Sequence, residues 1–206
     1  MGRVLLGIML GLVFFPLGVL GYWKFGRVPV AVADEPLPME TYLTEVPLKT
    51  RIEFEEVNNP PVKADEDAFM AGAHIYAQEC AVCHGFHGKA SRFGMHMAPK
   101  AALLWEKTGK DDAVGVSGDP LGATYWKVEN GIRQTGMPSF KGILTPLQIW
   151  QVSTLLANAN KPLPPEAIVL LRGETPAGTD GAAAGTQAAG LTAPAGMKLE
   201  VSKRAD

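Results

Sequence analysis

The chain has 206 residues, a formal net charge of −2 and a hydrophobic content of 47%. This length allows one domain of ordinary size with appendages. The balanced charge argues against a nucleic-acid partner, which would require a basic stripe, and two cysteines are too few for a four-cysteine zinc or iron–sulfur site.

The first hydrophobic segment, residues 4–22, carries no charged side chain. As a helix its nineteen residues span about 28 Å, which is enough to cross a hydrocarbon core of about 30 Å. Trp23, Lys24 and Arg27 follow, as is typical of a membrane–water interface. We predict a single transmembrane anchor with its flanks over residues 1–27, in contact with the lipid bilayer through residues 4–22.

A signal peptide cleaved after Ala33 is the alternative, because Ala31-Val32-Ala33 resembles a cleavage site. Two features favour an uncleaved anchor. The apolar run is longer than the usual core of a signal peptide, and residues 24–29 separate it from the cleavage-like triplet.

The next segment, residues 28–63, is rich in proline, and we predict a semi-extended spacer between membrane and domain. Val46, Leu48 and Ile52 alternate weakly with polar residues. Part of the spacer could therefore lie on the domain as a strand-like arm, and a plain linker is an equal alternative.

A helix is predicted to begin after Asp65, which is a good N-cap residue. Apolar positions then recur with helical spacing, so that one face is formed by Phe69, Ala73, Tyr76 and Cys80. Gly72, on the neighbouring track, would let another helix come close.

A second strong helix is predicted from the capping box at residues 145–148, which has proline at the first helical position. Shorter helices are predicted over residues 102–106 and 122–130, the latter ended by Gly131. No alternating run of strand length appears, so we predict an all-α domain over residues 64–172. Residues 173–206, rich in alanine, glycine, threonine and proline, are predicted to be a disordered tail.

The motif with a specific chemical meaning is Cys80-Ala81-Val82-Cys83-His84. Two thiols with this spacing can each bond to one vinyl group of a haem, and His84 can then bind the iron. A thioredoxin-like pair would follow a strand in an α/β pattern, and a zinc site would need two further ligands at close spacing. We therefore predict one covalent haem c with its iron.

Haem attachment of this kind takes place on the far side of an energy-transducing membrane. We therefore predict a single-pass protein of the bacterial cytoplasmic (inner) membrane, with the haem domain and a periplasmic spacer on the outer side. Lys24 and Arg27 lean weakly towards the opposite orientation. The cysteine motif outweighs them.

The sixth iron ligand is sought among the methionines and histidines that follow the motif. His87 is too close to His84 to reach the opposite face of the ring. Met137 lies 53 residues after His84, in a loop with glycine before it and proline after it, so the chain can return on that face. Met95, Met97 and His96 stay open as alternatives.

Over residues 65–161 the sequence resembles the class I cytochrome c family. The likeness rests on CAVCHG at the end of the first helix, on NGIRQTGMPSF, and on the closing helix TPLQIWQVSTLLA. The resemblance implies a small helical fold around the haem, His84/Met137 ligation, and a crossing of the first and last helices that Gly72, Tyr76 and Trp150 match.

From these features we predict a haem protein that transfers single electrons in a respiratory or photosynthetic chain and is not itself an enzyme. We expect its partners to be membrane-bound redox proteins. We expect no nucleic-acid partner and no small-molecule substrate. Two alternatives are an integral haem subunit of a larger membrane oxidoreductase, and an enzyme or gas sensor with an open iron site. The second requires that Met137 does not bind the iron.

Overall fold

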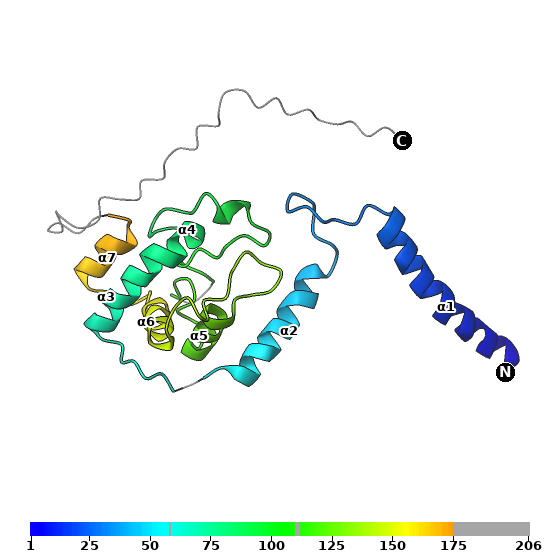
Figure 1. Cartoon of the computed structure of the whole chain (residues 1–206), viewed down its shortest axis with the longest axis horizontal. Helices are drawn as coiled ribbons and strands as arrows, with labels where there is room; N and C mark the ends of the chain where they lie inside the picture. The colour runs from blue at the N-terminus through cyan, green and yellow to red at the C-terminus, as the bar shows by residue number, and fades with distance from the viewer. Residues whose placement is uncertain (58, 110–111, 175–206) are drawn as a thin grey trace, which may run out of the picture. The chain divides into compact units, whose positions relative to one another are not determined.

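The computed structural model describes residues 1–57, 59–109 and 112–174 (Figure 1). Most of the predicted tail, residues 175–206, lies outside these described residues. The described part of the chain contains helices and loops and no β-sheet, since its strand-like pairing is limited to isolated bridges. The prediction of an all-α chain is confirmed.

The N-terminal segment forms one long helix, α1 (Gly2–Phe25), which contains Pro16. Its apolar stretch has a mean hydropathy of 2.5 over an 18-residue window, so its length and composition suit a membrane span. The predicted helix is therefore present. The triplet that resembles a cleavage site lies in an exposed turn, in which the Ala31 N–H donates to Asp34 Oδ2 at 2.9 Å. An exposed turn is compatible with cleavage after Ala33 as well as with an uncleaved anchor.

Helix α2 (Glu40–Glu55) occupies much of the segment that we predicted to be semi-extended, and that prediction is wrong for these residues. The spacing of Leu48 and Ile52, which we interpreted as weak alternation, is i to i+4 and serves a helical face equally well. Ile52 is buried, with 6% of its surface exposed. The helix even accommodates Pro47.

Helix α2 packs against α5 (Leu121–Asn130), the helix that precedes Met137. Trp126 Nε1 donates to Glu55 Oε2 at 3.0 Å. The Arg51 hydrogen bond, followed by that of Trp126, holds the pKa of the Glu55 carboxyl below its usual range. Just after α2, the Val57 backbone lies where a side chain on Gly122 would be. Residues near the end of the predicted spacer are thus joined to α5.

We expect Gly122→Val to loosen this junction, because any Cβ at Gly122 collides with the Val57 carbonyl oxygen. Trypsin should then cut at Lys49 and Arg51 about tenfold faster, since local unfolding exposes the cleavage sites. Limited proteolysis followed by intact-mass analysis measures the rate. Gly118→Val is the matched control, because a Cβ there meets only the Ala113 side chain at 3.3 Å. Equal digestion of the two variants would contradict the packing.

The first helix of the domain runs through three segments, α3 (Glu66–Ile75), the π-helical turn η1 (Tyr76–Cys80) and α4 (Ala81–His84). The predicted cap is confirmed, because the Asp65 side chain accepts from the Ala68 N–H at 3.0 Å. A π-helical turn inserts one extra residue per turn, and such turns often occur at functional sites. Here the turn ends at Cys80, the first cysteine of the motif.

Helix α6 (Pro146–Ala157) packs against α3 (Figure 1), and both bonds of the predicted capping box are present. Gly72 lies at the contact, since a Cβ built on it would be 2.6 Å from the Gln151 carbonyl oxygen and 2.9 Å from Leu155 Cβ. The predicted close approach is therefore confirmed. Trp150 of α6 stacks on Tyr125 of α5, with ring centroids 4.1 Å apart.

The prediction of a short helix over residues 102–106 is wrong, and one short helix was not predicted. Residues 102–106 form a turn and no helix, because their backbone serves other segments: Glu106 O accepts from the Gly115 N–H at 2.9 Å. A further short helix, α7 (Pro165–Leu171), was not predicted, although Pro164 and Pro165 suit a helix start. It buries Ala167 and Leu171 in the core.

Candidate functional site

The cysteine motif lies at the C-terminal end of the first domain helix. Cys80 ends η1, and Cys83 and His84 lie in α4, after which Gly85 turns the chain with φ of 78°. The two thiols are not joined in a disulfide. Burial, followed by the charge of Glu79, raises the pKa of the Cys80 thiol to about 12. Neither sulfur atom is held in a disulfide, so both are free to bond to a vinyl group.

His84 is oriented by the loop that follows the motif. Its Nδ1 lies 2.8 Å from the Ala102 carbonyl oxygen. Because a carbonyl only accepts, Nδ1 carries the proton and Nε2 keeps its lone pair free. Burial lowers the pKa of His84, so the ring is neutral at neutral pH. A neutral imidazole with one nitrogen hydrogen-bonded to the backbone is the usual form of a metal-binding histidine.

The loop of residues 85–102 is held directly on the motif. Ser91 Oγ donates to the Val82 carbonyl and accepts from the Gly94 N–H, the latter at 3.1 Å. Gly94 itself lies against the Cys83 carbonyl, so closely that no Cβ would fit. These contacts position Ala102 to receive the His84 hydrogen bond.

Met137 lies in a loop that closes on the end of α5. Gly131 ends α5 as predicted, with φ of 67°, and a Cβ on it would be 2.6 Å from the Pro138 carbonyl carbon. Within the loop, Ile132 N donates to the Met137 carbonyl at 3.3 Å, and the Met137 N–H donates to Thr135 Oγ1 at 3.1 Å. The partly buried Met137 side chain packs against the hydrophobic core.

The alternative ligands have different surroundings. Met95 is 39% exposed, and His96 Nδ1 is engaged with the Arg92 carbonyl at 2.9 Å. Met97 lies at the Met137 loop, where its sulfur is 2.9 Å from a Cβ built on Gly136. The structure thus joins the loop after the motif to the Met137 loop through Met97. No pattern in the sequence pointed to this contact or to Thr135.

The surroundings of the motif fit a haem. Trp105 Nε1 is buried without a hydrogen-bond partner, and the Trp105 ring packs edge-on against Tyr76 with centroids 5.2 Å apart. A buried donor of this kind suits a polar substituent of a large, otherwise apolar group. Among the described residues, no three His, Cys, Asp or Glu side chains gather as a metal-ion site. Cys80, Cys83, His84 and Met137 stay the residues that we predict to hold the haem.

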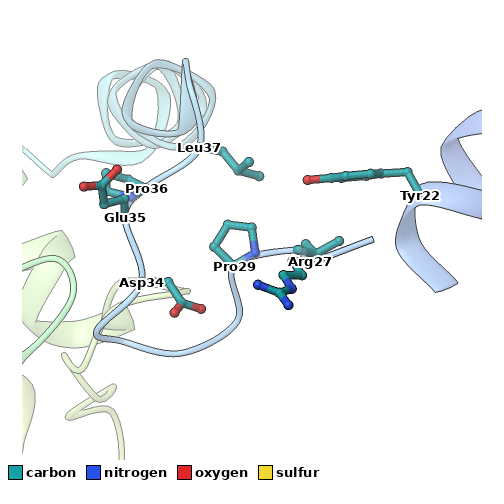
Figure 2. Close-up of a pocket in the computed structure, with 8 residues that line it drawn as sticks. Tyr22, Arg27, Pro29, Asp34, Glu35, Pro36 and Leu37 are labelled. Atoms are coloured by element: carbon teal, nitrogen blue, oxygen red, sulfur yellow. The ribbon is translucent and has the colours of Figure 1, made fainter. Parts of the chain in front are cut away.

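The cleft shown in Figure 2 belongs to a different part of the chain, at the end of α1 and in the turn that follows it. The residues that line it are Tyr22, Arg27, Val28, Pro29, Asp34, Glu35, Pro36 and Leu37. It contains no residue of the cysteine motif or of the Met137 loop.

Replacing Tyr76 by phenylalanine is expected to destabilise the domain. Its buried hydroxyl donates to the Gly85 carbonyl at 2.6 Å, directly behind the motif. Loss of the donor leaves a buried carbonyl unpaired, at a cost of about 1–3 kcal/mol. Chemical denaturation of the haem-loaded protein measures this cost. Tyr125→Phe is the control, since its hydroxyl makes only a 3.4 Å contact with Glu129, and an equal effect of both substitutions would contradict the assignment.

Comparison with known families identifies the kind of domain. Residues 67–156 match the family model described as cytochrome C oxidase, cbb3-type, subunit III. The chain carries a c-type cytochrome domain. Such a domain binds haem c covalently, which confirms the predicted cofactor and its iron.

The cytochrome domain also has a similar curated relative, described as Cbb3-type cytochrome c oxidase subunit CcoP of Azospirillum sp. (strain B510). The two sequences are 28% identical over 159 residues, which is 69% of this chain and 47% of the relative. The chain thus spans about half the length of that relative.

Proposed function

We propose that this protein is a membrane-tethered mono-haem cytochrome c that transfers single electrons between redox partners of a respiratory or photosynthetic chain. The observation that carries the proposal is His84, which follows two free thiols and is held by Ala102 so that Nε2 is left to bind iron. Haem c supplies a one-electron ferric/ferrous couple when it is bound.

The chain's residues have separate roles in this proposal. Cys80 and Cys83 would hold the haem through thioether bonds, each made by addition of the S–H group across one vinyl double bond, with the hydrogen going to the neighbouring carbon. His84 Nε2 and the Met137 thioether would both bind the haem iron. A thioether opposite an imidazole favours the reduced state and raises the reduction potential.

In this proposal α1 is the membrane anchor, and the cysteine motif supports an outer position of the domain. The helix anchors the protein in the cytoplasmic membrane of a bacterium, with the cytochrome domain on the periplasmic or outer side. The tether keeps the domain at high local concentration near integral-membrane partners. A free carrier would dock briefly, through a small interface.

A permanent subunit of a larger membrane oxidoreductase is the second candidate. It is supported by the relative, which is described as an oxidase subunit. Purification in a mild detergent separates the two candidates. Isolation of the cytochrome alone supports the free carrier, and a stable complex of constant stoichiometry supports the subunit.

Haem attachment is tested by a pyridine haemochrome spectrum of the denatured protein. Covalent haem stays with the polypeptide during extraction with acid acetone. The double variant Cys80→Ala/Cys83→Ala should lose all covalent haem. Extraction of the haem from the unmodified protein would overturn the proposal.

A further inference from the structure

Helix α2 has an exposed, mainly apolar stripe that its packing against α5 does not use. Leu43, Val46, Thr50 and Phe54 follow one another at intervals of three, four and four residues. At about 100° per residue, this spacing places them on one side of the helix. Leu43 is 64% exposed, Val46 is 44% exposed and Phe54 is 84% exposed. We call these four residues the outer stripe.

The opposite side of α2 is the one that packs on the cytochrome domain. Among residues Glu40–Glu55, all of which the structure describes, only Leu48 and Ile52 are shielded from solvent. They lie about 160° around the helix axis from the middle of the outer stripe. Because α2 contacts α5, the helix has the domain on one side and the outer stripe on the other.

The basic side chains of α2 pair with acidic ones of the same helix. Lys49 Nζ lies 3.9 Å from Glu53 Oε1, and Arg51 Nε lies 2.5 Å from Glu55 Oε1. The helix carries four acidic and two basic side chains, so its net charge is 2 − 4 = −2. A binding partner of the outer stripe is therefore held by apolar contact and not by attraction to negative charge. An apolar stripe between charged side chains is typical of a helix that lies in a membrane–water interface.

The lipid bilayer lies within reach of α2. Helix α1 ends at Phe25 and α2 begins at Glu40, so the fourteen residues 26–39 join them. Fully extended, this connection spans no more than about 50 Å. A surface tethered at such a distance has a high effective concentration, so a short apolar stripe is enough for binding. Tyr42, 61% exposed, lies at the edge of the stripe, and tyrosine is enriched at membrane–water interfaces.

We propose that α2 lies in the surface of the membrane that α1 crosses, with the outer stripe between the lipid headgroups and the first carbons of the acyl chains. This inference rests on the membrane tether of the proposed function. Because α5 packs on the opposite side of α2, the helix carries the cytochrome domain. The domain is thus held on the bilayer in one orientation, and its motion on the tether is restricted.

The test uses the full-length, haem-loaded protein with one copy in each nanodisc of phosphatidylcholine. Part of the lipid is an analogue that carries a diazirine near the ester end of its acyl chain. After irradiation, mass spectrometry of tryptic peptides locates the labelled residues. We expect Leu43, Val46 and Phe54 to be labelled about tenfold more than Ile143 and Leu147. The latter two are 61% and 54% exposed, so they control for labelling of any exposed apolar side chain.

Two matched double variants test the outer stripe itself, with labelling of the unchanged Phe54 as the readout. Leu43→Gln/Val46→Gln should lower this labelling about fivefold, because it removes the apolar contact of the neighbouring turns. Thr41→Gln/Thr44→Gln changes two exposed residues of the same turns that lie off the stripe, and it should leave the labelling unchanged. Equal labelling of Phe54 in the two variants would overturn the proposal.

Trypsin shows whether α2 still packs on the domain in these variants. Cleavage at Lys49 and Arg51 should proceed at the same rate in both variants and in the unmodified protein, all in detergent. Faster cleavage in Leu43→Gln/Val46→Gln alone would mean that the outer stripe holds α2 on the domain, and the proposal would be wrong.

The lipid composition separates apolar contact from electrostatic binding. Salt at about 0.5 M should leave the labelling of Phe54 unchanged, because screening does not weaken apolar contact. Addition of phosphatidylglycerol should not raise it, since α2 has a net negative charge. Loss of labelling in salt, or a rise with phosphatidylglycerol, would contradict the proposed contact.

The labelling of α1 distinguishes this inference from the proposed function. Label on α1 together with none on the outer stripe rejects this inference alone, and the stripe then faces water or a protein. An unlabelled α1 rejects the membrane tether of the proposed function.

Discussion

Met137→Ala is expected to remove the near-infrared methionine-to-iron absorption band and to let carbon monoxide bind the reduced protein. The Thr135 hydrogen bond and the Gly131–Pro138 contact position the Met137 backbone, so loss of the side chain leaves the loop in place and removes only the thioether. The reduction potential should fall by about 0.1–0.3 V, because axial ligands set much of its value. Absorption spectroscopy and redox titration measure both effects.

Met95→Ala and Met97→Ala are the matched controls for this substitution. Met95 is exposed, and Met97 packs against Gly136. Met95→Ala should keep the near-infrared band unchanged. If Met97→Ala abolishes the band while Met137→Ala retains it, Met97 is the ligand. If the unmodified reduced protein itself binds carbon monoxide and lacks the band, the electron-carrier proposal gives way to an enzyme or sensor with an open iron site.

Gly72→Val should destabilise the domain by at least about 3 kcal/mol, since overpacking at a close helix contact forces backbones apart. The helices α3 and α6 meet at this residue, and the Gln151 carbonyl oxygen lies 2.6 Å from the position of a Cβ. A flexible side chain could rotate away from the new Cβ, but the Gln151 carbonyl oxygen belongs to a helix backbone and can move only if α6 moves with it. Denaturant titration of the haem-loaded protein gives the change in the free energy of unfolding.

His74→Val controls for the β-branched side chain in the same helix. His74 is exposed in α3, so this substitution should cost well below 1 kcal/mol. Similar losses in both variants would show that helix propensity and not the α3–α6 contact is responsible.

The signals that were strongest in the sequence depended on neighbouring residues. The Asp65 cap, the capping box at Thr145 and Gln148, and the helix stop at Gly131 are all present in the structure. Each depends on hydrogen bonds or backbone angles within a few residues, so local sequence suffices to predict it. The attachment motif is equally local.

The predictions that failed concerned segments whose conformation depends on distant contacts. Helix α2 contains Pro47 and has a weak pattern, and it packs against α5 through Ile52 and the bond from Trp126 to Glu55. Residues 102–106 looked helical in isolation. In the structure the Ala102 carbonyl accepts from His84 instead, 18 residues earlier in the chain.

By itself the sequence determined the kind of cofactor and a hydrophobic segment long enough for a membrane span, and it predicted the two attachment cysteines and the proximal histidine, because each is a property of adjacent residues. Only the tertiary structure decided that Ala102 orients His84 and that Met97 reaches the Met137 loop. The physical reason is the same in each case. Which groups meet across a fold is set by packing between segments, which spacing along one segment does not encode.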